Sequence, residues 1–183
     1  MQERTVTVDG QTHRLPDPFL VIATQNPWEH EGIFPLPESQ LDRFLFKITL
    51  DCCDAEHELE MLKLVHTGIA PDTLGEIRPL VGLAGLDRAR IELDSTTVPD
   101  EIAEHIVGLV RTTREMPGVV LGASSRSAFH LLAAAKANAR LDGRDEVTHE
   151  DVRNVAPFVL RHRLICEGAT PDAVLVEALD ALG

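Results

Sequence analysis

Three short segments of this sequence contain polar side chains whose types and surroundings could do chemistry. The first is Ala23–Pro27, in which Asn26 follows a short apolar run. An uncharged amide at the end of a strand can hold a water molecule by hydrogen bonding without changing the charge of a site. The alternative is that Asn26 only forms a turn before Pro27, which is common for such pairs.

The second segment runs from Leu36 to Phe44 and contains Arg43 immediately before an apolar run. A planar guanidinium group can bind two phosphate oxygens at once, so an arginine at the edge of a sheet suits phosphate recognition. The alternative is that Arg43 forms an ion pair with a nearby acid such as Asp42 or Glu38. Taken by itself, the segment favours this alternative.

The third segment is Gly122–Arg126. Ser124 is a good helix N-cap residue, so Arg126 would lie in the first turn of a helix. A cation opposes the helix dipole there, at a cost of a few tenths to about 1 kcal/mol. A bound phosphate would resolve the conflict, because Arg126 and the free backbone N–H groups would both face it. The alternative is an arginine that points into solvent.

A small α/β region has to position the first two segments. Arg4–Val8 alternates polar and β-branched residues, and Asp9-Gly10 separates it from Gln11–Leu15, which predicts a β-hairpin. Phe19–Thr24 is a continuous apolar run, typical of a strand buried on both faces of a parallel sheet. Phe44–Leu50 is expected to be a second strand of this kind. Ligands bind at the carboxyl ends of such strands.

Every further segment is expected to be helical. Apolar residues recur at helical spacing, and acidic or capping residues mark the helix starts. The expected helices cover residues 54–67, 79–89, 99–115 and 124–141, with two more that open at the capping box Thr148–Asp151 and at Thr170-Pro171. The expected fold is therefore an α/β remnant in residues 1–51, with the hairpin and two parallel strands, followed by an all-α bundle in residues 52–183. The chain is mainly α overall.

Composition excludes several classes of protein. A net charge of -13 argues against a general nucleic-acid binder, which would present basic surfaces to phosphates. The 3 cysteines, two of them adjacent, do not form a disulfide framework, and the 8 scattered histidines match no metal-binding motif. No apolar run approaches the ~18 residues of a membrane span. No apolar signal region follows Met1, so a cytoplasmic location is expected.

The three segments occur together, in the order and at the spacing of one protein family. The chain resembles the MoxR family, a branch of the AAA+ ATPases. The resemblance covers nearly the whole chain, and the combination of ATQNP, LPESQLDRF and GASSR is specific although each motif alone is weak. The matching stretches are TVTVDG, LPDPFLVIATQNPWEHEG, FPLPESQLDRFLFKI and VVLGASSRSAFHLLAAAKANARLDGRDEVTHEDVRNVAPFVLRHRL.

The resemblance implies a role for each candidate residue. Asn26 resembles sensor 1, which positions the water that attacks the γ-phosphate. Arg43 resembles the arginine finger, which acts on the nucleotide of the neighbouring subunit. Arg126 resembles sensor 2 on the helical lid, and with Ser124 it is expected to contact the nucleotide. The segment Arg161–Arg163 also matches the lid, without an assigned role.

The resemblance also implies a function for the complete protein. It would bind ATP and Mg²⁺, assemble into a ring that we expect to be a hexamer, and remodel protein complexes in the manner of a chaperone. Its clients would be proteins, such as metalloenzymes or partners with a VWA domain, and neither nucleic acid nor a membrane span is expected. Two alternatives are a non-enzymatic helical interaction module and a fragment of a motor subunit like that of magnesium chelatase. The wording of the motifs fits MoxR better.

The sequence also departs from the family pattern. The 183 residues contain no GxxxxGK[ST] loop and no apolar strand ending in paired acids, the Walker A and Walker B motifs. We therefore expect a truncated form of such an ATPase, which alone neither hydrolyses ATP nor binds a nucleotide tightly. Ser125 stands where the family usually has proline, and Cys52-Cys53 where it usually has Tyr-Pro. We also expect residues 1–51 to be less ordered than the lid, or covered by another chain.

Overall fold

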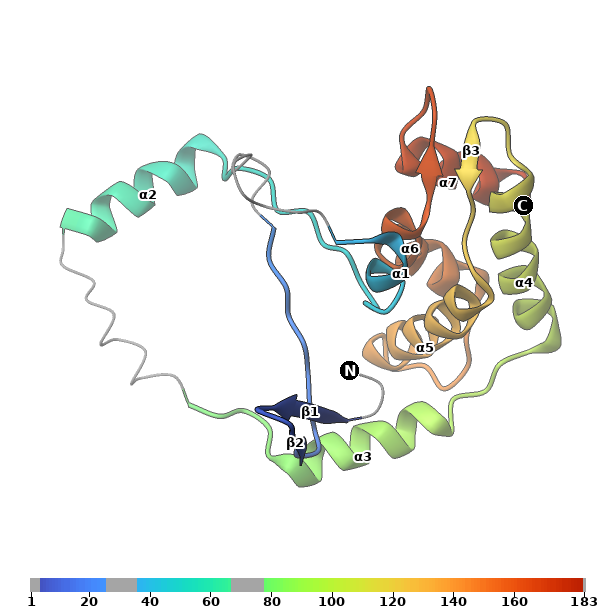
Figure 1. Cartoon of the computed structure of the whole chain (residues 1–183). Coiled ribbons are helices and arrows are strands. Elements are labelled where there is room, and N and C mark those ends of the chain that lie inside the picture. Colours follow the sequence, from blue (N-terminus) through green and yellow to red (C-terminus); the bar gives the residue numbers. More distant parts are fainter. Residues whose placement is uncertain (1–3, 26–35, 67–77, 183) are drawn as a thin grey trace. The chain divides into compact units, whose positions relative to one another are not determined.

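The computed structural model of the chain describes residues 4–25, 36–66 and 78–182 (Figure 1). The chain divides into two compact units, Met1–Pro35 and Leu36–Gly183. The first contains the β-hairpin. The second contains the helices, and within it the predicted boundary between residues 51 and 52 stays a prediction.

The first unit confirms the predicted hairpin. Strands β1 (Thr5–Val8) and β2 (Gln11–Arg14) pair in antiparallel register. The two residues between them, Asp9 and Gly10, have φ angles of 50° and 77°. Positive φ at both central residues is the geometry that two-residue hairpin turns prefer, and Asp-Gly adopts it readily.

The two predicted parallel strands are not formed. Residues 19–24 and 44–50 take no regular secondary structure, and neither segment pairs with a strand among the described residues. A strand needs a neighbour that satisfies its backbone N–H and C=O groups. In the second segment these groups bind the helical region instead, since the Lys47 N–H donates to the carbonyl oxygen of Phe158 at 2.9 Å. The mainly α architecture, a small remnant followed by a helical bundle, is confirmed.

Most of the second unit is helical. The single-turn helix α1 (Glu38–Leu41) precedes the longer helices. The predicted helix over 79–89 instead begins at Leu83, after Gly82, and continues to Asp94. This displaced helix is α3 (Leu83–Asp94). The other predicted helices begin close to their predicted starts, and they are α2 (Ala55–His66), α4 (Asp100–Glu115), α5 (Ser125–Leu141), α6 (His149–Leu160) and α7 (Pro171–Asp180). The 3-10 turn η2 (Arg161–Arg163), which was not predicted, follows α6.

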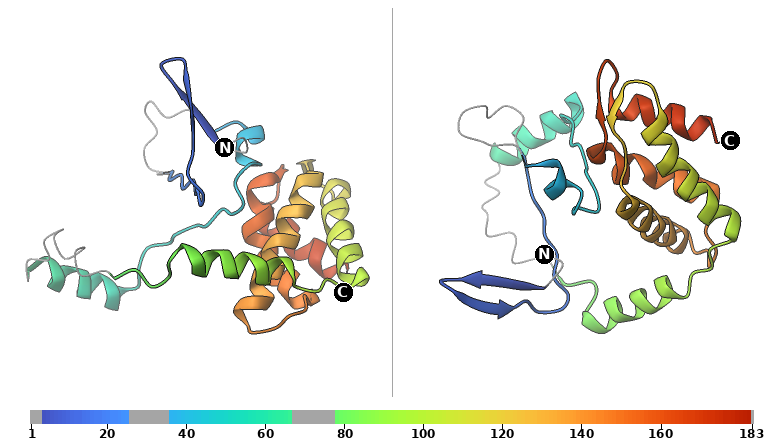
Figure 2. Two further views of the ribbon diagram at one scale, coloured as in Figure 1. Left: turned by 90° about the horizontal axis from the view of Figure 1, so that it is seen from below. Right: turned by 45° about the vertical axis from the view of Figure 1, so that its right-hand side comes forward.

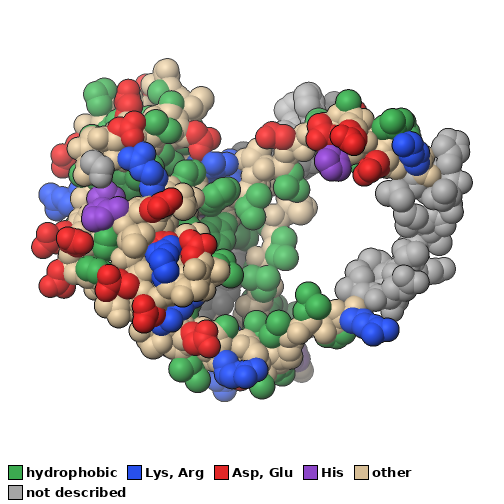
Figure 3. Space-filling view, turned by 180° about the vertical axis from the view of Figure 1, so that it is seen from behind, with side chains coloured by type: hydrophobic (Ala, Val, Ile, Leu, Met, Phe, Trp, Pro, Cys, Tyr) green, Lys and Arg blue, Asp and Glu red, His purple; other side chains and the backbone are tan. Residues whose placement is uncertain are grey.

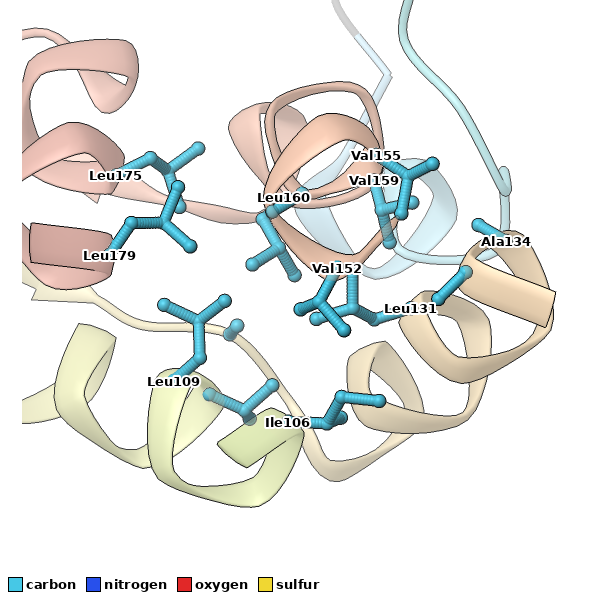
Figure 4. Close-up of a cluster of buried hydrophobic side chains, with 14 of the residues drawn as sticks. Ile106, Leu109, Leu131, Ala134, Val152, Val155, Val159, Leu160, Leu175 and Leu179 are labelled. Atoms are coloured by element: carbon cyan, nitrogen blue, oxygen red, sulfur yellow. The ribbon is translucent and has the colours of Figure 1, made fainter. Parts of the chain in front are cut away.

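Helices α4, α5, α6 and α7 form the core of this unit. α5 packs on α4 and α6, and α7 packs on α4 and α6, as both views in Figure 2 show. Their buried side chains point toward one another in a single cluster (Figure 4). The predicted apolar stripe of α4 lies in this cluster and consists of Ile102, Ile106, Leu109 and Val110. Fully burying such a side chain stabilises a fold by about 1.5–3 kcal/mol.

A short antiparallel pair, which the sequence did not predict, joins two loops of the bundle. Strand β3 (Val119–Leu121) pairs with β4 (Ile165–Cys166). Gly118 turns the chain with a φ of 77°, and its carbonyl oxygen accepts from the Glu167 N–H at 2.7 Å. Strands of three and two residues are too short for a periodic signal. The pair places the start of α5 near the end of η2.

Side-chain caps fix the starts of the last two helices. Thr148 and Asp151 form the predicted capping box at α6, and the Thr170 hydroxyl accepts from the Ala173 N–H at 3.2 Å at α7. None of the helices in the described ranges is long and apolar enough to cross a membrane. On the face shown in Figure 3, acidic and basic side chains are interspersed over the bundle, so the negative net charge is not gathered in one patch there.

Candidate functional site

Of the three predicted catalytic residues, Arg43 and Arg126 lie among the residues that the structure describes. Asn26 lies outside the described residues. Arg43 follows α1, and its side chain is exposed. Within the described part of the chain, no ion pair or side-chain hydrogen bond involves Arg43, so the predicted alternative of pairing with Asp42 or Glu38 is not formed.

The Asp42 carboxylate turns away from Arg43 and into the helical bundle. Its Oδ1 accepts from Nε of Arg163 at 2.9 Å, and both of its oxygens lie 3.1–3.2 Å from the Ser124 hydroxyl. Nη1 of Arg126 lies 3.6 Å from Oδ2 of the same carboxylate. One acidic group therefore gathers two guanidinium groups and the N-cap of α5, from positions more than 80 residues apart.

Arg163 connects α1 to the bundle through the backbone as well. Its Nη2 donates to the carbonyl oxygens of Asp42 at 3.1 Å and of Phe44 at 2.6 Å. Its Nη1 donates to the carbonyl oxygen of Val159, and the Arg163 side chain is only 1% exposed. The backbone on both sides of Arg43 is thus bound by one buried guanidinium group. Such charge-assisted bonds are about twice as strong as neutral ones.

Two histidines accompany this arginine. Nε2 of His162 lies 3.1 Å from the carbonyl oxygen of Phe44, and Nδ1 of His130 contacts Nη2 of Arg163. Burial lowers the pKa of His162 to about 4, although the bond to Phe44 opposes it. Burial, followed by the positive charge of Arg163, also lowers the pKa of His130. Both rings are therefore neutral at pH 7, and neither adds positive charge beside Arg163.

The start of α5 is fixed by α4. At Gly122 a Cβ atom would lie 2.7 Å from Cα of Arg114, so only glycine fits this approach without a backbone shift. Nε of Arg114 donates to the carbonyl oxygen of Ala123 at 2.7 Å. The Ala123 N–H donates to the Thr113 hydroxyl at 3.1 Å. These contacts set the position of Ser124 and, through it, of Arg126.

Arg126 lies in the first turn of α5, as predicted, with Ser124 at the N-cap. The Ser124 hydroxyl makes no capping bond and donates to Asp42 instead. A carboxylate therefore lies next to the predicted anion site. The Arg126 side chain remains 40% exposed, so it can also reach a second anion from solvent. A cation and a helix N-terminus side by side are suited to binding phosphate oxygens.

The site does not supply the ligands of a metal ion. Among the described residues, no three acidic, histidine or cysteine side chains come together in a way that could hold one. The sequence also lacks the P-loop Ser or Thr that binds Mg²⁺ beside a nucleotide. Among the described residues, the groups suited to an anion at this site are Arg126 and the N-terminus of α5.

Comparison with known proteins agrees with these features. Residues 1–46 match the family described as "ATPase family associated with various cellular activities (AAA)", and residues 111–180 match the AAA lid domain. The chain is 40% identical over 188 residues to the uncharacterized protein YeaC of Bacillus subtilis, covering 100% of this chain and 58% of YeaC. It is 40% identical over 174 residues to chaperone MoxR1 of Mycobacterium tuberculosis, covering 90% of this chain and 45% of MoxR1.

A solved structure shares the fold. A putative ATPase from Cytophaga hutchinsonii superposes with a TM-score of 0.86 at 34% identity, over 98% of this chain and 58% of that one. The chain belongs to the MoxR family of AAA+ ATPases. The predicted fold class, an α/β remnant followed by a helical lid, is confirmed with it. This MoxR chain spans 58% or less of the length of the relatives described above.

The two family matches cover different parts of the candidate site. Residues 1–46 include Asn26 and Arg43, and residues 111–180 include Ser124, Arg126 and Arg163. The Asp42 carboxylate, in the region that matches the AAA family, therefore binds Ser124, Arg126 and Arg163 in the region that matches the lid domain. The individual roles of these residues remain proposals.

Sequence reasoning missed the two groups that organise the site. The sequence indicated Asp42 only as a possible ion-pair partner of Arg43, and it indicated no role for Arg163. Their partnership spans 121 residues, so no local pattern could reveal it. One signal was present, because Arg163 follows directly on the apolar end of α6, and an arginine buried in such surroundings needs a charged or polar partner.

Proposed function

We propose that this chain is part of a MoxR-type ATPase that assembles into a ring and uses ATP hydrolysis to remodel protein complexes in the cytoplasm. The observation that carries the proposal is the geometry around Asp42. A half-exposed arginine and a helix N-terminus lie on one side of this residue, and an exposed arginine follows it in the chain. Both arginines are suited to bind phosphate groups.

Each predicted residue then has a defined task. Arg126, beside Ser124, would contact the γ-phosphate of the nucleotide in its own subunit as sensor 2. Arg43 would reach the nucleotide of the neighbouring subunit as the arginine finger, because its side chain is exposed and unpaired among the described residues. Asn26 would orient the attacking water as sensor 1. Phosphoryl transfer depends on positioned cations of this kind, since negative charge has to be matched in the transition state.

The proposed role of Arg43 requires that the subunits assemble into a ring. Arg43 acts only if a second subunit places its nucleotide beside it, and we propose a hexamer. The name of the similar protein "Chaperone MoxR1" supports a chaperone-like activity on protein clients. Metalloenzymes and proteins with a VWA domain are the client classes that we propose. ATP and Mg²⁺ would bind in the complete protein, with the metal ligands supplied from outside the described residues.

Steady-state ATP hydrolysis by the complete subunit tests this function. Arg43→Ala should lower kcat by about 10³-fold or more, the range measured for arginine fingers, with little change in nucleotide binding. Arg126→Ala should weaken nucleotide binding as well as kcat. Arg111→Ala removes an exposed arginine of α4 and should leave both unchanged. Equal activity of all three variants would show that neither arginine acts on ATP.

Mixed rings separate the two roles. Subunits with a disabled Walker A lysine but an intact Arg43 should restore hydrolysis to Arg43→Ala subunits, because the finger acts across the interface. They should not restore it to Arg126→Ala subunits, which lack a group that acts within their own site. The purified 183-residue chain should not hydrolyse ATP, and turnover that survives Arg126→Ala would contradict this.

A further inference from the structure

The backbone around the predicted finger is attached to the lid by one side chain. Arg163 binds the carbonyl oxygens of Asp42 and Phe44 at 3.1 and 2.6 Å, and these residues flank Arg43 on both sides. The two bound carbonyl groups belong to the peptide bonds that precede Arg43 and follow Phe44, so these two residues lie between fixed peptide groups. The Arg43 and Phe44 N–H groups also bind the carbonyl oxygens of Gln40 and Leu41 at 3.2 and 3.0 Å, so Arg163 adds to these local turn bonds the link between this backbone and the lid.

Asp42 links Arg163, and with it the backbone around the predicted finger Arg43, to Arg126, the predicted γ-phosphate sensor. The Asp42 carboxylate lies 2.9 Å from Nε of Arg163 and 3.6 Å from Nη1 of Arg126. The Lys47 N–H adds a bond to the carbonyl oxygen of Phe158 at the end of α6. Residues 42–47 are thus bound to the lid at several points.

We propose that Arg163 is the positioning residue of the arginine finger, and that it attaches Arg43 to the same rigid body as Arg126. This inference rests on the proposed function. A γ-phosphate bound at Arg126 would then bias the position of the finger that acts on the neighbouring subunit. Coupling of this kind requires an element that both sites contact, and the lid with residues 42–47 bound to it is such an element.

An arginine is needed for this task. Arg163 uses Nε, Nη1 and Nη2 to reach one carboxylate and three carbonyl oxygens. A lysine could keep one ion pair with Asp42 inside the protein, but its single ammonium group cannot span the carbonyl oxygens on both sides of Arg43. Arg163→Lys therefore preserves the charge and removes the clamp.

The first measurement uses the 183-residue chain and needs no ATPase activity. In the wild-type chain, backbone ¹⁵N relaxation should give order parameters of about 0.85 for the amides of Arg43 and Phe44. In Arg163→Lys these values should fall below about 0.6, while the amides of α5 and α6 stay rigid. Arg161→Lys is the matched control, because Arg161 contacts Pro157, Phe158, Thr49 and Asp172 and makes no hydrogen bond or ion pair with residues 42–44. Unchanged order at positions 43 and 44 in Arg163→Lys would overturn the proposal.

The second measurement uses mixed rings of the complete subunit. Arg163→Lys should lower kcat at least tenfold with unchanged nucleotide binding, and Walker A-disabled subunits with an intact finger should restore the activity, as for Arg43→Ala. A defect that those subunits do not rescue would place Arg163 in its own nucleotide site and overturn the proposal. If the wild-type ring has no ATPase activity, the proposed function fails, and the order parameters still decide whether Arg163 positions residue 43.

Discussion

Removing the Asp151 carboxylate should destabilise the helical unit more than any surface change. The carboxylate is fully buried and accepts five hydrogen bonds of 2.6–2.8 Å, from Nδ2 of Asn138, from both Nη atoms of Arg144, and from the N–H and hydroxyl of Thr148. Burial alone would raise the pKa of Asp151, but these donors outweigh it and hold the pKa well below its ordinary value. The ionised form is therefore part of the fold.

The magnitude follows from what Asp151→Ala leaves behind. Breaking a buried ion pair by removing one partner costs about 3–5 kcal/mol. Arg144 is 37% exposed and keeps Asp142 at 3.0 Å, so its charge is partly solvated, and the lower end of that range applies. Loss of the capping box at Thr148 adds about 1 kcal/mol. We expect a loss of about 3–4 kcal/mol for Asp151→Ala and about half of that for Asp151→Asn, which keeps the shape.

Urea unfolding of the whole chain, followed by circular dichroism at 222 nm, measures this loss as a lower midpoint at unchanged slope. Glu150→Ala is the matched control, since it removes an exposed acid from the same helix turn and should cost less than about 1 kcal/mol. Because the pKa of Asp151 is depressed, its contribution is complete above pH 3.8 and declines as the pH falls further. An Asp151→Ala effect no larger than that of Glu150→Ala at pH 7 would refute the reasoning.

Two further changes test the surroundings of the site. Gly122→Ala forces a Cβ atom to 2.7 Å from Cα of Arg114, so thermal unfolding should show a loss of about 1–3 kcal/mol, whereas Gly143→Ala, with nothing near its side-chain position, should show only the strain of its positive φ. Because burial lowers the pKa of His162 from 6.5 to about 4, folding stability should fall between those pH values as the unfolded chain gains a proton. His162→Gln should flatten this part of the pH profile, and an unchanged slope would show that His162 is not buried in the neutral form.

Local chemistry predicted the parts of the fold that depend on neighbours in the sequence. Asp9-Gly10 fixed the hairpin turn, and the Thr148–Asp151 capping box fixed the start of α6. The apolar run of residues 44–50 was misleading, because an apolar run is compatible with a strand but does not provide the partner that makes one. In this structure the partner is the end of α6.

The candidate site was only partly predictable for the same reason. The place of Arg126 in the first turn of α5 could be inferred because Ser124 takes the N-cap position, although its hydroxyl donates to Asp42 and makes no capping bond. The binding of Asp42 by Arg163 could not, since it depends on how α1 meets η2 in three dimensions. The expected conflict between Arg126 and the helix dipole was a useful signal. The structure shows that a carboxylate of the same chain lies beside it.

The hairpin of β1 and β2 should be less stable than the helical bundle. Nearly all side chains of β1 and β2 are exposed, whereas α4, α5, α6 and α7 share one buried cluster. A two-stranded hairpin without a covered apolar face is marginally stable in water. Amide hydrogen exchange in the 183-residue chain should therefore be fast at Thr5–Arg14 and slow in α5 and α6.

The same measurement on assembled complete subunits provides the contrast. If a neighbouring part of the ATPase covers the hairpin, exchange at Thr5–Arg14 should slow on assembly while exchange in α5 and α6 changes little. Equal protection of the hairpin and the lid in the monomeric 183-residue chain would contradict the expectation. It would mean that the hairpin draws stability from within the chain, and that residues 1–51 need no cover from elsewhere.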